Sequence, residues 1–136
     1  MKDKLKFYIN GAWVNSESNE KIKVINPANE ELIGHVAAGT KDDINIAVLA
    51  AKEAFKTYQF TSKENRIEII NNIITEYKRR YDDLVQTITE EMGAPLWLSE
   101  KAQASTGIKN LHETLDALNE YEFEKLAFKI FSKLIS

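Results

Sequence analysis

The sequence predicts an α/β fold in which short N-terminal β-hairpins are followed by about four α-helices. The first third holds short runs of alternating or β-branched residues separated by turn-forming residues. From Thr40 onward, apolar residues recur instead at the 3.6-residue spacing of amphipathic helices. Strands this short are unstable alone, so we expect a helical layer or another sheet to cover them.

The N-terminal strands are expected to form two hairpins. The first lies between residues 7 and 14 around Asn10-Gly11, a pair that adopts the positive φ angles of a type I′ turn at little steric cost. The second joins Lys21–Ile25 to Glu31–Ala37. Its turn, Asn26–Asn29, contains Pro27, which fixes φ, and two asparagines, which tolerate left-handed backbone.

The first two helices are predicted from their N-terminal signals and their apolar stripes. Thr40 with Asp43 comes close to a capping box, and Thr61-Ser62-Lys63-Glu64 has the full capping-box pattern. The stripes are Ile44, Ala47, Val48, Ala51, Phe55 and Tyr58 in the first helix, and Ile67, Ile70, Ile74, Tyr77 and Tyr81 in the second.

The third and fourth helices are predicted in the same way. The third begins near Asp82-Asp83, whose charges suit a helix N-terminus, and ends at Gly93. Pro95 starts the fourth, in which Gly107 costs about 1 kcal/mol relative to Ala and so marks a close contact. The apolar residues are Leu84, Val85, Ile88 and Met92 in the third helix, and Ala104, Ile108, Leu111, Leu115 and Leu118 in the fourth.

Composition excludes several classes of function. The chain has 136 residues, enough for one domain, and no cysteine, which rules out a disulfide scaffold, a thiolate metal site and a cysteine nucleophile. Its net charge of −3 argues against nucleic acid as a partner. No apolar run approaches the ~20 residues of a membrane span, and no signal peptide is evident, so we expect a cytoplasmic protein without a membrane partner.

The chain shows no catalytic or cofactor-binding motif of its own. Its two histidines, His35 and His112, stand outside recognisable motifs and are expected to be surface or structural residues. The five glycines are scattered and form neither a G-x-G-x-x-G nor a Walker pattern. We therefore assign no residue of this chain as catalytic or as cofactor-binding.

The order of several short segments resembles the opening of the NAD(P)-dependent aldehyde dehydrogenases. The series is specific because the segments follow one another at matching spacing over roughly residues 6–124. The resembling segments are Tyr8–Val14, Val24–Glu30, Ile33–Ala37, Ile44–Phe55, Arg66, and Glu90–Pro95, the last being similar to the E-x-G-K-P turn of that family.

The resemblance implies a domain organisation. Enzymes of this family are several hundred residues long and carry a Rossmann-like cofactor domain, so residues 1–124 are expected to be the N-terminal part of that domain. Residues 125–136 share nothing with the pattern and are interpreted as a divergent basic, apolar tail. A frame change, an early stop or a split gene are the hypotheses for the short length.

The resemblance also implies a reaction, the oxidation of a small aldehyde to a carboxylic acid with NAD or NADP. In the family a cysteine forms a thiohemiacetal, hydride passes to the nicotinamide, and a glutamate-activated water hydrolyses the thioester; the enzymes are homo-oligomers. This chain lacks the cysteine, the general-base glutamate and the cofactor motif. We expect an inactive N-terminal segment that holds no cofactor by itself. The alternatives are a helical interaction module, or half of a split enzyme needing a second, complementing chain.

Two candidate sites follow from the resemblance. The backbone carbonyls of Val24 and Ile25, with the Glu91 carboxylate, match a monovalent-cation site of the family. A bound cation would also balance the negative charge of Glu91, which the helix dipole disfavours at a helix C-terminus. A nearby lysine or solvation by water would balance it equally. Ala102 and Thr106 match positions on the helix face that lines the substrate tunnel. Ala94 stands where the family has the lysine of G-K-P.

Overall fold

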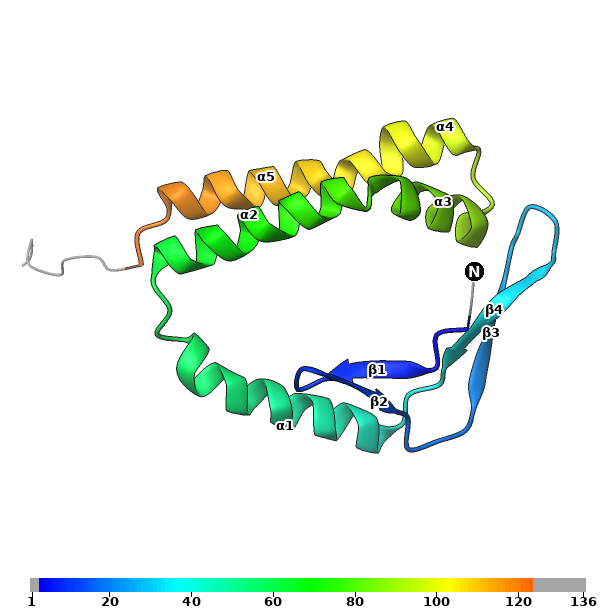
Figure 1. The fold of residues 1–136 in the computed structure, drawn as a ribbon, viewed down its shortest axis with the longest axis horizontal. Helices are drawn as coiled ribbons and strands as arrows, with labels where there is room; N and C mark the ends of the chain where they lie inside the picture. The colour runs from blue at the N-terminus through cyan, green and yellow to red at the C-terminus, as the bar shows by residue number, and fades with distance from the viewer. Residues whose placement is uncertain (1–2, 124–136) are drawn as a thin grey trace, which may run out of the picture.

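The computed structural model describes residues 3–123 and has two β-hairpins followed by helices (Figure 1). This confirms the predicted α/β class and the order of its parts. The strands are β1 (Lys6–Ile9), β2 (Ala12–Asn15), β3 (Lys21–Ile25) and β4 (Leu32–Ala37). The helices are α1 (Lys41–Tyr58), α2 (Lys63–Arg79), α3 (Tyr81–Met92), α4 (Leu96–Leu98), the π-helical turn η1 (Ser99–Ala104) and α5 (Ser105–Glu120).

Both predicted hairpins are present as antiparallel pairs, β1 with β2 and β3 with β4. Asn10 and Gly11 have φ angles of 52° and 77°, the positive values that a type I′ turn requires. The N-terminal segment lies along the edge of β4, where Lys4 N–H donates to the His35 carbonyl at 2.7 Å and Ala37 N–H donates to the Lys4 carbonyl at 3.0 Å.

Helix α1 begins at the predicted capping box. Thr40 Oγ1 accepts from the Asp43 backbone N–H at 3.1 Å, and the Asp43 carboxylate accepts from the Thr40 N–H at 2.8 Å. The apolar stripe of α1, in contrast, stays open: Ile44 is 61% and Phe55 58% exposed. The two short hairpins are too small to cover this stripe, so α1 presents an exposed hydrophobic surface.

The buried apolar residues of the described part lie in the later helices. Ile74 of α2, Val85 of α3 and Ala104 of η1 are buried, and α2 runs beside α5 (Figure 1). Tyr77 Oη donates to the Ala104 carbonyl at 2.9 Å and lies directly against Gly107. Gly107 thus marks a close helix–helix contact, as predicted, because a side chain there would meet the Tyr77 ring.

The boundary between α2 and its neighbours differs from the prediction. The N-cap is Ser62, whose Oγ accepts from the Asn65 N–H at 3.1 Å, so the Thr61-to-Glu64 capping box is wrong. The reason is that the Thr61 hydroxyl is committed to the end of α1, where it donates to the Tyr58 carbonyl at 2.7 Å. Tyr81 begins α3 instead of ending α2, because the backbone turns at Arg80.

The predicted fourth helix is not one α-helix but three elements in succession, α4, η1 and α5. Pro95 is the N-cap of α4. In the π-helical turn the carbonyl of residue i bonds to the N–H of residue i+5. Ser99 and Ala104, at its two ends, are both buried, and η1 packs against α3. Met92, which the apolar pattern of the third helix places on its buried side, is instead 56% exposed, because the neighbouring turn contacts Gly93 and not Met92. Residues 125–136, the predicted tail, lie outside the described residues.

Candidate functional site

The predicted cation site draws on two segments that the fold brings together. Val24 and Ile25 end β3, and Glu91 lies in the last turn of α3. The end of α3 touches the turn after β3: a Cβ built on Gly93 would lie 2.7 Å from the backbone nitrogen of Ala28. Gly93 has φ 63°, so its lack of a side chain serves both the left-handed backbone and this close approach.

The donor groups at this place are oxygens, which suit a hard monovalent cation. The β3–β4 pairing is irregular between Val24 and Ile25, and the Glu91 side chain is exposed. Within residues 3–123, no three or more His, Cys, Asp or Glu side chains gather closely enough to hold a metal ion. A cation here would therefore depend on backbone carbonyls, and the site stays a prediction.

Ala102 and Thr106 are both exposed and stand on either side of the junction between η1 and α5. The Thr106 Oγ1 donates to the Ala102 carbonyl at 2.6 Å, which uses its hydroxyl proton within the helix. This contact fixes the side-chain rotamer of Thr106 and leaves its methyl group as the apolar part. The assignment of the two residues to a substrate tunnel stays a prediction.

The most elaborate polar constellation surrounds Asp43, which is only 5% exposed. Its carboxylate accepts from Ser16 Oγ at 2.8 Å, from the Glu17 N–H at 3.0 Å, and from the Thr40 hydroxyl at 2.9 Å as well as the Thr40 N–H. The backbone N–H of Thr40, then that of Glu17, lowers the pKa of Asp43 to about 2. Asp43 is thus a fixed anion that joins the loop after β2 to the start of α1.

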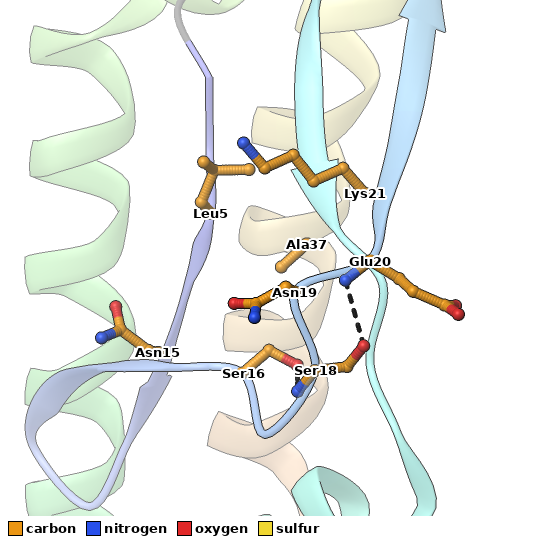
Figure 2. A pocket seen from close by; sticks show the side chains of 8 residues that line it. All are labelled: Leu5, Asn15, Ser16, Ser18, Asn19, Glu20, Lys21 and Ala37. Atoms are coloured by element: carbon orange, nitrogen blue, oxygen red, sulfur yellow. Dashed lines mark hydrogen bonds between the residues drawn. The ribbon is translucent and has the colours of Figure 1, made fainter.

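A pocket of about 610 Å³ opens beside this constellation, between the first hairpin and the start of β3 (Figure 2). Its serines are used in local turns: Ser16 Oγ accepts from the Ser18 N–H at 3.2 Å, and Ser18 Oγ accepts from the Glu20 N–H at 3.0 Å. No histidine is among its lining residues, and the Ser16 hydroxyl donates to the Asp43 carboxylate, which is a weak base at neutral pH because its pKa is about 2. The lining residues are Leu5, Asn15, Ser16, Ser18, Asn19, Glu20, Lys21 and Ala37.

Several other charged side chains also have partners within the chain. Arg79 and Arg80 both form ion pairs with Glu76, at 2.7 and 2.6 Å. These contacts lower the pKa of Glu76 to about 2, and the hydrogen bond from Arg79 is the largest cause. His35 Nδ1 lies 3.1 Å from the Asp3 carboxylate, and His112 is exposed on α5. None of these groups is arranged as a nucleophile with a base.

Sequence reasoning found the capping role of Asp43 but missed its contacts with Ser16 and Glu17, which lie 27 and 26 positions earlier in the chain, respectively. A capping aspartate has a local signal, since it stands three residues after a threonine. Its partners in the preceding loop have none, because nothing in a sequence shows which distant loop reaches a helix N-terminus.

Comparison with known proteins decides the family. The model of the aldehyde dehydrogenase family matches residues 13–133. The chain belongs to the aldehyde dehydrogenase family. A putative aldehyde dehydrogenase of Staphylococcus aureus, strain bovine RF122 / ET3-1, is 50% identical to this aldehyde dehydrogenase chain over 125 residues. That alignment covers 92% of the chain and 26% of the relative.

Solved aldehyde dehydrogenases have the same fold over this part. The enzyme from Bartonella henselae aligns with a TM-score of 0.90 at 34% identity, over 94% of this chain and 27% of its own. A mutant of aldehyde dehydrogenase C from Pseudomonas syringae, solved with NAD⁺ and octanal, aligns with a TM-score of 0.86 at 36% identity, over 89% of this chain and 25% of its own.

The chain therefore spans about a quarter of the length of the aldehyde dehydrogenases it matches, and the matched quarter is their N-terminal part. This confirms the resemblance found in the sequence, including the Rossmann-like context of the fold. Among residues 3–123, no helix is both long and apolar enough to cross a lipid bilayer.

Proposed function

We propose that this chain supplies the N-terminal, supporting part of an NAD-dependent aldehyde dehydrogenase and performs none of the chemistry itself. The observation that carries the proposal is the TM-score of 0.90 over 94% of the chain, against a length that spans 27% of the Bartonella enzyme. The NAD⁺ and octanal bound to the Pseudomonas relative support NAD, ahead of NADP, and a small aldehyde as the reactants of the whole enzyme.

The inactivity of the chain alone follows from the chemistry of the reaction. A sulfur nucleophile must attack the aldehyde carbonyl before hydride can leave, and the sequence has no cysteine. Within residues 3–123, the half-buried hydroxyl of Ser16 donates to the Asp43 carboxylate, whose pKa of about 2 makes it a poor base at neutral pH. The chain can position neighbouring segments, but it holds no group that forms the covalent intermediate.

The direct test is a spectrophotometric assay of the purified 136-residue chain with NAD⁺ and octanal. We expect no aldehyde-dependent formation of NADH, and no change in tryptophan fluorescence when NAD⁺ is added. The full-length Staphylococcus relative is tested in parallel to establish that the assay conditions are suitable. NADH production by the chain alone would overturn the proposal.

A second candidate function is half of a split enzyme, completed by another chain. The exposed apolar face of α1 favours it, because Ile44, Val48 and Phe55 are each 45% exposed or more. Mixing the chain with a polypeptide carrying the remaining three-quarters of a relative discriminates between the candidates. Restored NADH production supports the split enzyme, whereas self-association without activity supports an interaction module, and assembly into homo-oligomers is expected only of the completed enzyme.

We also propose that Val24, Ile25 and Glu91 hold a monovalent cation. The contact between Gly93 and the turn after β3 supports this, since it places the two segments side by side. Potassium or sodium chloride should then raise the melting temperature of the chain more than tetramethylammonium chloride does. Glu91→Gln should remove the difference, whereas Glu68→Gln, a change at an exposed position of α2, should keep it.

Ala102 and Thr106 are proposed as part of the path by which the aldehyde reaches the reacting sulfur in the whole enzyme. Their exposure on one helical junction supports this proposal. In a full-length relative carrying this segment, Ala102→Phe should raise KM for a long aldehyde such as octanal and leave KM for acetaldehyde nearly unchanged. Equal effects on both aldehydes would argue against a tunnel position.

A further inference from the structure

Lys63 occupies a position that its own helix does not favour. It is the first residue of α2, where the helix dipole disfavours a cation. Its Nζ donates instead to the backbone carbonyls of Asn119 at 2.5 Å and Tyr121 at 3.2 Å, at the end of α5. The last carbonyls of a helix lack intrahelical partners, so this lysine serves the C-terminus of another helix.

Arg66 lies one turn further along α2, and its guanidinium joins three segments. Nε donates to Thr61 Oγ1 at 3.1 Å and Nη2 to the Gln59 carbonyl at 3.2 Å, both in the turn between α1 and α2. The same group stacks over the rings of Tyr58 and Phe123, at 5.5 and 5.1 Å from their centroids. Arg66 thus places a cation between the end of α1 and the segment that follows α5.

The end of α5 has little of its own to hold it. No basic residue stands in its last turn, and the backbone becomes extended at Tyr121. The Tyr121 and Phe123 rings meet edge to face, with their centroids 4.8 Å apart. The start of α2 lies beside the end of α5 (Figure 1), and within residues 3–123 the two cations that complement this terminus come from α2.

We propose that Lys63 and Arg66 form a latch that fixes the end of α5 and residues 121–123 against the start of α2. The latch sets the direction in which the chain leaves α5. It can open without separating the other end of the helix pair, where Tyr77 binds the Ala104 carbonyl. The latch concerns this chain's own contacts and does not depend on the proposed enzymatic function.

Hydrogen–deuterium exchange of the 136-residue chain, followed by mass spectrometry, tests the latch. In Lys63→Met we expect amides in residues 119–123 to exchange roughly tenfold faster, the factor for losing about one charge-assisted hydrogen bond. Arg66→Met should give a similar increase there and also in residues 59–61. Exchange in α3 and around Ala104 should stay at the wild-type rate, and Lys63→Arg should restore most of the protection.

Matched controls use cations of the same type outside the latch. Lys56→Met removes a lysine that pairs with Glu53 on an exposed surface, and Arg79→Met removes an arginine that pairs with Glu76. Both should leave residues 119–123 unchanged. Wild-type exchange of residues 119–123 in the Lys63 and Arg66 variants would overturn the proposal. An equal acceleration throughout α2, α3 and α5 would also overturn it, since the contacts would then belong to global folding.

Discussion

The strand region with α1 and the helical region from α2 to α5 are held together by different means. In the helical region the buried side chains include Ile74, Val85 and Ala104. The Tyr77 hydroxyl of α2 also donates to the backbone carbonyl of Ala104. In the N-terminal region, from residue 3 to the end of α1, the buried side chain is that of Asp43. It is a carboxylate that accepts four hydrogen bonds.

The difference shows which part of the chain carries its own core. Apolar burial stabilises in proportion to area, so the later helices can hold each other. The N-terminal region is joined by directional polar contacts, and its large apolar side chains Trp13 and Leu49 remain more than 60% exposed, as does Trp97 of α4. Such a surface needs a partner, which fits a chain that spans about a quarter of its relatives.

The largest effect is expected where the two regions meet, at Gly93. Gly93→Ala adds a Cβ at a left-handed residue, at a cost of about 1–2 kcal/mol. The same Cβ would also lie 2.7 Å from the Ala28 nitrogen, and such overpacking typically costs about 1–3 kcal/mol. A total loss of about 3 kcal/mol should appear in urea unfolding followed by circular dichroism.

Gly11→Ala is the matched control for the Gly93 prediction. Gly11 also has a positive φ, 77°, but a Cβ there would meet no atom within 4 Å. It should cost only the conformational part, about 1–2 kcal/mol. Equal losses for the two variants would mean that the contact between α3 and the Pro27–Ala28 turn contributes nothing.

Gly107→Ala tests the helical region alone, and a smaller effect is expected. The added Cβ collides with the Tyr77 ring and hydroxyl, which must move away from the Ala104 carbonyl. Overpacking of about 1–3 kcal/mol is partly offset by the gain in helix propensity, about 1 kcal/mol, leaving a net loss of about 1 kcal/mol. In the Tyr77→Phe background the loss should shrink, and an unchanged loss would place the collision elsewhere.

Asp43→Asn tests the N-terminal region alone. The Asp43 carboxylate only accepts hydrogen bonds, whereas the asparagine amide has one oxygen that accepts and one NH₂ group that donates. The NH₂ group would face another donor, so at least one of the contacts with Thr40, Glu17 and Ser16 must break. Hydrogen exchange should accelerate in residues 15–20 and in the first turn of α1, and stay unchanged in α5. Asp42→Asn, at the exposed neighbouring position, should change neither region.

The smallest effect is the pH dependence that Asp43 confers. Because hydrogen bonding lowers its pKa in the folded chain to about 2, Asp43 stabilises fully above about pH 4 and loses this contribution as the pH falls toward 2. Glu76, with a pKa also near 2, adds the same trend in the helical region. The difference between wild type and Asp43→Asn in melting temperature should therefore narrow between pH 4 and pH 2; a constant difference would contradict the account.

The features that sequence predicted well are those with local causes. The Asn10-Gly11 turn, the Thr40–Asp43 capping box and the Gly93 helix end each depend on a few adjacent residues, and all three are present. The π-helical turn at Ser99–Ala104 arises from packing against α3, so its sequence looks like that of an ordinary helix.

The site was less predictable than the fold. Val24, Ile25, Glu91, Ala102 and Thr106 rest on family resemblance, which supplies positions but no geometry. The Asp43 contacts and the latch at Lys63 join residues 26 to 58 positions apart, and polar residues in loops and at helix ends carry no signal of such distant partners. Family membership was accessible because it depends on the order of many short segments at once.

Region-resolved hydrogen exchange of the 136-residue chain, alone and with a polypeptide supplying the rest of a relative, tests the central claim most directly. Alone, the amides of α2 and α5 should exchange more slowly than those of α1, since the helical region has its own buried residues. With the complementing polypeptide, the exposed face of α1 should gain protection. Equal protection of α1 and α2 in the isolated chain, with no gain on mixing, would contradict the account.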